Sequence, residues 1–373
     1  MKEIKLGEIA KIITGKLDAN AANENGKYPF FTCSREILRI DNYAYDCECV
    51  LVAGNGDLNV KYYRGKFNAY QRTYIITLLD NQKYSTTFVF RLIESYLGTL
   101  RKNSNGSTIK YIRIGDLTEI SIPIIPLSEQ ERIVAFLDAE FEKIDQLKAN
   151  AAAQLQAAKD LFQAALKEML TPKDGWKYQP LGEITTSING LWKGKKPPYV
   201  NVGVIRNANF TKDFTLNTSN IEYLDVEERQ YKSRKLDKGD LIVEKSGGSE
   251  KQPVGRTILF DLEGDFSVSN FTSILRLKDK NAILPAFLYK YLLFVYKEGV
   301  TKTMQNAATG IHNIIYDQFL SIPIPVLPKE EQQRIVKLLD AITEKINSLR
   351  SNYDRTLTHC NDLKQALLKS IFA

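Results

Sequence analysis

The chain contains two copies of one long segment, and this internal repeat constrains the fold more than any local motif does. Residues 129–149 read EQERIVAFLDAEFEKIDQLKA, and residues 331–351, 202 positions later, read EQQRIVKLLDAITEKINSLRS. Just upstream, ISIPIIPLSEQ from Ile120 matches LSIPIPVLPKEEQ from Leu320. Each copy starts with Leu-Gly-Glu-Ile, at Leu6 and Leu181, an offset of only 175, so the second copy holds 27 more residues in its globular part.

Apolar residues recur at steps of three and four through both matched segments, which predicts two long helices. Each seam is roughly 54 Å long at the helical rise, well suited to pairing with an equally long partner. Ser128 and Glu131 have the spacing of a capping box at the start of the first helix. The seam positions are Ile133, Leu137, Phe141, Ile144, Leu147, Ala151, Leu155, Ala158, Phe162, Ala165 and Met169, then Ile335, Leu339, Ile342, Ile346, Leu349, Tyr353, Leu357, Cys360, Leu363, Leu367 and Ile371.

We expect the two helices to pair with each other rather than to act as ordinary core helices or as a generic dimerisation coil. An antiparallel pair places one globular head at each end and gives a pseudo-twofold molecule, so we favour it over the parallel arrangement. Because the helical segments match while the heads differ in length and in amino-acid sequence, we expect the two heads to recognise different targets.

The globular segments predict mixed α/β heads. Residues 49–53 and 73–78 are typical of strands and 88–97 of a short helix, and residues 240–243, 272–277 and the stretch from Pro285 repeat that order. The predicted fold class is therefore α+β, with two mixed α/β domains joined by two long helices in an antiparallel coiled coil, as a pseudo-twofold internal repeat. The expected divisions are residues 1–126, 127–171, 172–328 and 329–373.

Charge points to an anionic partner without identifying it. The net charge is +7, and each head carries a net +4, with 17 basic and 13 acidic residues in 1–126 and 21 and 17 in 172–328. Lys and Arg neutralise phosphates, and Arg can also hydrogen-bond base edges, whereas an ordinary solvated surface is the alternative for each single residue. The candidate contacts in polar or glycine-containing stretches are Lys61, Arg64, Lys66, Arg72, Arg101, Lys102, Lys110, Lys193, Lys195, Lys196, Arg206, Lys245, Lys251, Arg256 and Lys302.

Several catalytic classes lack the residues they need. Two histidines and four cysteines argue against a metal centre, a disulfide framework and histidine-based catalysis, and no Walker-type loop is present. Gly54-Asn55-Gly56 and Pro197-Pro198-Tyr199 imitate a DNA adenine methyltransferase, but Lys196 stands where that enzyme needs an acceptor for the target amino group. We therefore predict no catalytic residue, no metal and no cofactor. No run is long and apolar enough for a membrane helix, so we expect a cytoplasmic protein.

Two unlike heads alternating with two matched helices, each opened by Ile-Pro and Glu-Gln before Arg-Ile-Val-x-x-Leu-Asp, resemble the specificity subunit of type I restriction-modification systems. The resemblance covers essentially the whole chain, and the Glu-Gln at Glu129 and Glu331 is its most specific part. Gly239-Asp240-Leu241-Ile242-Val243 is similar to a stretch of the family's recognition domains.

The resemblance implies two target recognition domains, each binding one half of a bipartite, asymmetric site in double-stranded DNA. It implies that the helices set the spacing and dock two methyltransferase subunits, with restriction or translocase subunits as further partners. Catalysis, with S-adenosylmethionine, ATP and Mg²⁺, would then lie in those partners. The alternatives are a self-contained DNA adenine methyltransferase and a coiled-coil scaffold that binds no DNA.

Overall fold

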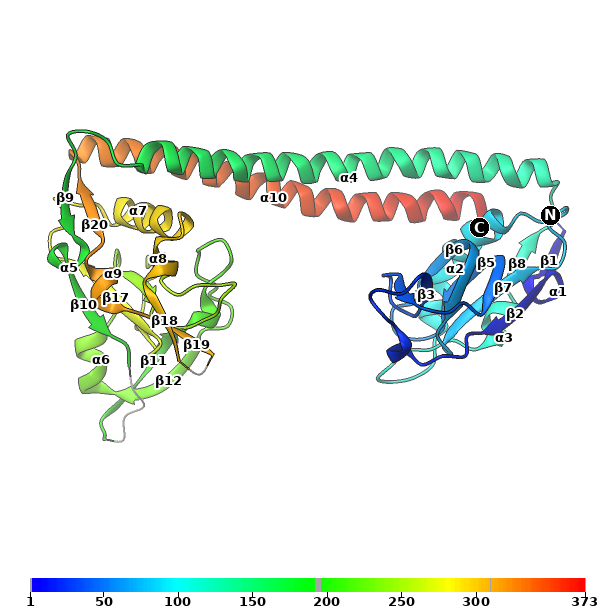
Figure 1. Cartoon of the computed structure of the whole chain (residues 1–373), viewed down its shortest axis with the longest axis horizontal. Coiled ribbons are helices and arrows are strands. Elements are labelled where there is room, and N and C mark those ends of the chain that lie inside the picture. The colour runs from blue at the N-terminus through cyan, green and yellow to red at the C-terminus, as the bar shows by residue number, and fades with distance from the viewer. Residues whose placement is uncertain (1, 192–195, 309, 373) are drawn as a thin grey trace. The chain divides into compact units, whose positions relative to one another are not determined.

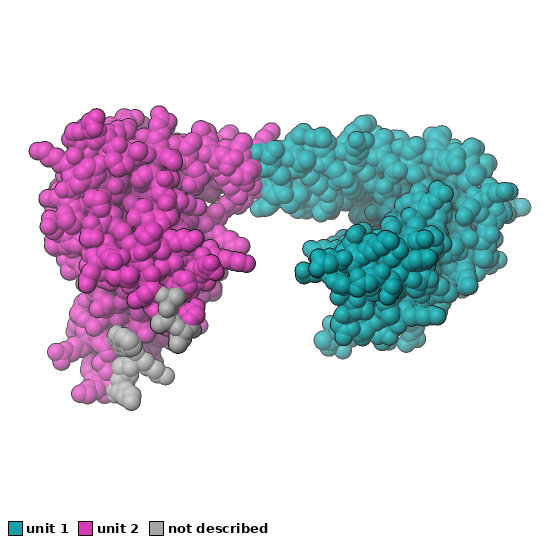
Figure 2. Space-filling view, in the orientation of Figure 1, with its two compact units in different colours: residues 1–153, 351–373 teal, residues 154–350 magenta. Residues whose placement is uncertain are grey.

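The computed structural model describes residues 2–191, 196–308 and 310–372 and divides the chain into two compact units. Unit 1 consists of residues 1–153 together with 351–373, and unit 2 consists of residues 154–350 (Figure 2). Each unit thus contains one globular head and a part of both long helices. The four-segment division with limits at residues 126, 171 and 328 stays a prediction, because the compact units follow packing and cut across both helices.

Two helices of 44 residues each are the longest elements of the chain: α4 spans Leu127–Leu170 and α10 spans Lys329–Phe372 (Figure 1). At 1.5 Å per residue each is roughly 66 Å long, longer than the apolar seam that predicted it. The expected cap at Ser128 is wrong, because α4 begins one residue earlier and Ser128 lies in its first turn.

The two helices run antiparallel, as predicted, and each unit shows this by itself. In unit 1, Ile144 of α4 lies in one hydrophobic cluster with Cys360 near the end of α10, and the Cys360 thiol donates to the Ile144 carbonyl at 3.8 Å. In unit 2, Leu166 near the end of α4 lies in one core with Ile335 near the start of α10. Early residues of one helix thus meet late residues of the other.

The predicted seam is wrong at two positions in unit 1. Leu147 is 55% exposed and Leu363 is 47% exposed. Polar pairs lie at this level instead: the Lys148 ammonium donates to the Asn361 side chain at 2.9 Å, and the Lys364 ammonium to the Asp145 carboxylate at 2.7 Å. Each of the two leucines follows two consecutive steps of three residues, and at 3.6 residues per turn these steps together rotate the side chain by about 120° away from the apolar row.

The head of unit 1 is built on a six-stranded sheet in the order β2-β7-β5-β6-β3-β4, with α2 packed against β5 and β6. Most pairs are antiparallel, whereas β3 pairs parallel with β6. The strands predicted at 49–53 and 73–78 and the helix predicted at 88–97 lie within β5, β7 and α2. The elements are β1 Glu3–Lys5, α1 Leu6–Ile9, β2 Ala10–Thr14, η1 Ala19–Ala21, β3 Tyr28–Phe31, β4 Leu38–Ile40, β5 Tyr45–Ala53, β6 Val60–Ala69, β7 Thr73–Leu78, α2 Thr86–Asn103, α3 Ile114–Thr118 and β8 Ser121–Pro123.

The head of unit 2 repeats this plan with more and shorter strands. Its described sheets have the orders β10-β17-β13-β15, β12-β11-β16, β14-β19-β18 and β20-β9. Its large helix α7 packs against β15. The elements are β9 Lys177–Pro180, α5 Leu181–Ile184, β10 Thr185–Asn189, β11 Tyr199–Ile205, η2 Asn207–Asn209, β12 Glu222–Glu227, α6 Glu228–Arg234, β13 Leu241–Glu244, β14 Ser246–Gly248, β15 Thr257–Leu259, β16 Phe266–Val268, β17 Thr272–Leu277, α7 Pro285–Lys297, α8 Val300–Thr303, β18 Gln305–Ala308, β19 Ile311–Ile314, α9 Tyr316–Leu320 and β20 Pro323–Val326.

The repeated Leu-Gly-Glu-Ile motif closes each head. Leu6 and Leu181 are fully buried, and their amides donate to the carbonyls of Ile120 and Ile322, both at 2.9 Å. Ile120 lies two residues before Ile122-Pro123, and Ile322 is the isoleucine of Ile322-Pro323, in the segments that lead into α4 and α10. The motif therefore ties the start of each head to the segment that leaves it.

Candidate nucleic-acid interface

A buried glutamine fixes each head to its long helix. The Gln130 side chain is fully buried; its oxygen accepts from the Ser85 amide at 2.9 Å, and its nitrogen donates to the carbonyls of Lys83 and Ile125, both at 3.0 Å. Because Ser85 is the N-cap of α2, this one side chain joins the start of α2 to the start of α4.

Gln332 repeats this arrangement in unit 2. Its oxygen accepts from the Leu284 amide, and its nitrogen donates to the carbonyls of Ala282 and Leu327, all at 2.8 Å. Leu284 is the N-cap of α7, as Ser85 is of α2. The glutamine of the Glu-Gln motif was expected only to open a helix; the structure assigns it the joint between head and helix.

The glutamate of the same motif pairs with the arginine three residues on. Arg132 donates to both Glu129 oxygens at 2.7 Å, and Arg334 to the Glu331 oxygens at 2.7 and 2.8 Å. Hydrogen bonds from these guanidinium groups lower the pKa of both carboxyl groups. The Glu129–Arg132 and Glu331–Arg334 ion pairs therefore stabilise the first turns of α4 and α10.

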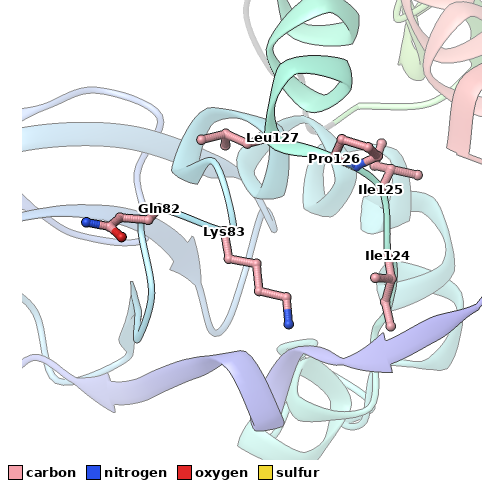
Figure 3. A pocket seen from close by; sticks show the side chains of 6 residues that line it. All are labelled: Gln82, Lys83, Ile124, Ile125, Pro126 and Leu127. Carbon is pink, nitrogen blue, oxygen red and sulfur yellow. The ribbon is translucent and has the colours of Figure 1, made fainter.

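A hollow of about 470 Å³ lies in unit 1, between the loop that precedes α2 and the segment that leads into α4. Figure 3 shows the side chains that line it. Apolar side chains of that segment form one wall, and Lys83 supplies the one ionisable side chain of the lining. A single ammonium beside apolar groups supplies no acid–base pair for catalysis. The lining residues are Gln82, Lys83, Ile124, Ile125, Pro126 and Leu127.

A more polar hollow, of about 440 Å³, lies where several loops of the first head meet. Two main-chain hydrogen bonds of Gly54 hold these loops together. The Gly54 amide donates to the Arg72 carbonyl at 2.8 Å, and the Ile112 amide donates to the Gly54 carbonyl at 2.9 Å. A Cβ on Gly54 would lie 2.5 Å from the Arg72 oxygen, so glycine is required for this close approach. The lining residues are Thr14, Gly15, Lys16, Gly54, Gln71, Arg72, Tyr74 and Ile112.

The second head has the equivalent hollow, of about 330 Å³. There the Lys245 amide donates to the Phe271 carbonyl at 2.9 Å, and the Ile314 amide to the Lys245 carbonyl at 2.8 Å. The Lys245 ammonium donates to the Asn189 side chain at 2.7 Å, and burial lowers the pKa of Lys245. The lining residues are Lys245, Ser246, Asn270, Phe271, Asn313 and Ile314.

The predicted basic candidates divide by exposure. Lys193 and Lys195 lie outside the described residues. Lys61, Arg206 and Lys245 are half-buried, and Arg256 is buried. The exposed candidates are Arg64, Lys66, Arg72, Arg101, Lys102, Lys110, Lys196, Lys251 and Lys302.

Several candidates are engaged within their own head. Burial lowers the pKa of Lys61, whose ammonium donates to the Ser34 carbonyl at 2.7 Å. Arg101 donates to the Leu58 carbonyl at 2.5 Å, and Arg206 pairs with Glu222 at 2.7 Å. These side chains stabilise loops and strands of the heads.

Arg256 is a correction to the predicted set. Its guanidinium donates to both oxygens of Glu244 at 2.7 and 2.9 Å, and the two side chains are 9% and 1% exposed. A buried bidentate pair cannot reach a phosphate without unfolding its surroundings. Arg256 therefore belongs to the interior of the head, and we remove it from the candidate contacts.

The structure brings Arg72 and Lys110 to one place in the first head. The Gly56 amide donates to the Lys110 carbonyl at 2.8 Å, next to the Gly54 contact with Arg72. Both side chains are exposed. Sequence reasoning missed Gln71 beside Arg72 in the first head and Asn270 beside Phe271 in the second head, because it searched for basic residues only. The remaining exposed candidates stay predictions.

Two negative findings apply to the described parts of the chain. Within residues 2–191, 196–308 and 310–372, no group of three or more His, Cys, Asp and Glu side chains is arranged to hold a metal ion. In the same ranges, no helix combines the length and the apolar character that a bilayer crossing requires.

Comparisons with known proteins show what the chain is similar to. The family model described as "Type I restriction modification DNA specificity domain" matches residues 1–157 and 173–354. The EcoDI specificity subunit of Escherichia coli is 44% identical over 165 residues, which are 44% of this chain and 36% of that protein, so the match spans little more than a third of that relative. The EcoBI specificity subunit of Escherichia coli is 22% identical over 87% of this chain and 73% of its own length.

Solved structures share the fold. A chain from a structure concerned with complex assembly and conformational transition of the type I R-M system has a TM-score of 0.72 at 20% identity, covering 100% of this chain and 97% of that one. The HsdS subunit from Thermoanaerobacter tengcongensis has a TM-score of 0.53 at 20% identity, covering 100% and 96%. The predicted α+β fold, with two sheet-containing heads and paired long helices, is confirmed.

Proposed function

Because the chain belongs to the type I restriction-modification DNA specificity family, we propose that each of its heads binds one half of a bipartite, asymmetric sequence in double-stranded DNA. The observation that carries the proposal is the double match to the DNA specificity domain, once over each head. The two heads share the main-chain contacts around Gly54 and Lys245 and differ in the side chains presented there.

The chain is a specificity subunit and is not itself an enzyme. Neither the comparisons nor the geometry supports a self-contained methyltransferase. Gly54, which imitated a cofactor loop, is instead required where β5 approaches the Arg72 carbonyl. A scaffold that binds no DNA receives no support either.

For partners, we propose two methyltransferase subunits and, in the complete complex, restriction or translocase subunits. The relatives support this, since they are specificity subunits of type I restriction enzymes. S-adenosylmethionine, ATP and Mg²⁺ would serve those partners rather than this chain. We place the complex in the cytoplasm, where its proposed DNA target is accessible.

For the long helices, we propose the role of a spacer and of a docking surface for the methyltransferase subunits. Two observations support the spacer: α4 and α10 each continue without a break for 44 residues, and they pair antiparallel. The Gln130 and Gln332 joints attach a head at the start of each helix.

Exchange of one head tests the proposal. Residues 1–126 are replaced by the corresponding head of another family member, and the chain is produced in cells together with its methyltransferase subunits. Genome-wide mapping of methylated motifs should then show one changed half-site and one unchanged half-site. The matched exchange of residues 172–328 should change the other half only. A change of both half-sites after a single exchange would contradict the proposal.

A further inference from the structure

The same β-turn precedes the last central strand in both heads. In the first head the Thr73 amide donates to the Tyr70 carbonyl at 2.8 Å, and in the second the Thr272 amide donates to the Ser269 carbonyl at 3.0 Å. The two central residues of the turns, here named the tip residues, are Gln71-Arg72 in the first head and Asn270-Phe271 in the second.

Main-chain contacts hold both turns in the same way. The carbonyls of Arg72 and Phe271 accept from the equivalent amides of Gly54 and Lys245, at 2.8 and 2.9 Å. Thr73 and Thr272, next to the tips, are 1% and 0% exposed. Because neither anchor uses a tip side chain, the backbone position of each tip is independent of the residue that stands there.

The tip side chains differ in chemistry, and three of the four are exposed, whereas Asn270 is half-buried. Gln71 and Arg72 are exposed, and Phe271 is 47% exposed directly beside a fully buried threonine. The Arg72 guanidinium makes no hydrogen bond or ion pair with any described residue, whereas Arg35 is paired with Asp57 at 2.6 Å. Both tips line the hollows described above.

We propose that the tip residues determine specificity, with Gln71-Arg72 and Asn270-Phe271 contacting base edges in their respective half-sites; this rests on the proposed function. Arg donates in a bidentate manner to O6 and N7 of guanine, Gln and Asn pair with adenine, and Phe contacts the thymine methyl group. The first head therefore requires a guanine opposite Arg72. Phe271 at the equivalent place favours a thymine in the other half-site.

Substitution of Arg72 tests the assignment in the complete complex. R72A removes the guanidinium, and R72K keeps the charge but not the bidentate geometry. The matched control is K11A, which removes an exposed cation of the same head, on β2, that is neither a candidate contact nor part of the lining of the hollow. Methylated motifs are mapped in cells, and duplexes carrying the wild-type motif or one substituted base pair are used for binding by the purified complex.

Both R72A and R72K should reduce discrimination at one guanine of the first half-site by roughly 5-fold to 150-fold, the value of one bidentate base contact. K11A should leave the motif unchanged. F271A should relax one position of the other half-site, while its control L224A, a substitution at a residue 44% exposed on β12, should not.

Three results would overturn the assignment. The first is a methylated motif and a base discrimination that remain as in the wild type. The second is binding that weakens equally on all duplexes, as expected for a phosphate contact. The third is a single tip substitution that alters both half-sites. Thermal unfolding of each variant identifies misfolding. If R72A misfolds, the result with R72K decides whether Arg72 determines specificity. Failure of the proposed function is distinct, since the wild-type complex would then methylate no interrupted motif.

Discussion

Substitution of Gln130 by leucine should destabilise unit 1 far more than the size of the change suggests. Leucine has nearly the volume and the helix propensity of glutamine, so the substitution removes hydrogen bonds without a large cavity. Three main-chain groups lose their partner: the Ser85 amide and the carbonyls of Lys83 and Ile125. The leucine cannot donate or accept, and the joint between α2 and α4 is left unsatisfied.

The expected loss follows from the number of groups and their access to water. A buried polar group without a partner costs about 1–3 kcal/mol. Ser85 and Ile125 are half-buried, so water compensates in part, and we expect the free energy of unfolding to fall by about 2–5 kcal/mol. At about 2–4 °C per kcal/mol for a unit of this size, the transition should shift down by roughly 4–20 °C.

Differential scanning calorimetry and urea unfolding measure this loss. The matched control is Q146L, because Gln146 is an exposed glutamine of the same helix that donates only to Asn150 at 2.7 Å. Q332L should have an effect like that of Q130L, but on the transition of unit 2. The reasoning is refuted if Q130L and Q146L lower the free energy of unfolding equally.

Three further predictions concern other parts of the chain. R256A should lower the free energy of unfolding by about 3–5 kcal/mol, because it leaves the buried Glu244 carboxylate unpaired. In urea unfolding the double variant E244L/R256M should recover most of that stability, and an equal loss in the single and double variants would contradict the pairing. Removal of one turn within residues 149–158, with a matched removal in α10, should shorten the gap of the methylated motif by roughly one to two base pairs and leave both half-sites unchanged, since a turn is about 5.4 Å and a base-pair step about 3.4 Å; an unchanged gap would argue against the spacer. A hydrogen bond from Arg35 lowers the pKa of Asp57, so this ion pair stabilises the fold at neutral pH and loses that effect as the pH falls through the lowered pKa; R35A should move the NMR titration midpoint of the Asp57 carboxyl group upward, and an unmoved midpoint would exclude the assigned cause.

The long helices could be predicted because their signal is repetitive and local. Thirty-odd residues of regular apolar spacing leave few alternatives, and a second copy makes chance unlikely to explain the pattern. The exposed Leu147 and Leu363 show where this reasoning ends, since a rule that accepts every step of three or four residues also accepts two successive steps of three, which rotate the side chain off the contact line.

For the candidate interface, the sequence predicted that each head carries a net positive charge, but not which basic residues are accessible. Arg256 looked like a surface cation because its partner Glu244 is 12 positions away and meets it only across paired strands. The equivalence of Arg72 and Phe271 could be predicted from the sequence, since each directly precedes a predicted strand that starts with threonine, but the main-chain hydrogen bonds that hold both turns are visible only in the structure. The glutamine joints were visible as a repeated motif, but their role depends on the N-caps of α2 and α7, more than 40 positions upstream.

The glutamine joint has a consequence for how such chains can diversify. At both joints the side chain binds one amide and two carbonyls of the backbone and no side chain of the head. The hydrogen bonds of this joint can form with any head that offers the same three peptide groups, provided that the apolar contacts between head and helix are also kept. Recombination within the flanking repeats could thus join a head from another chain to a helix that already carries the required glutamine. The resulting protein would recognise a new sequence without a new interface between head and helix.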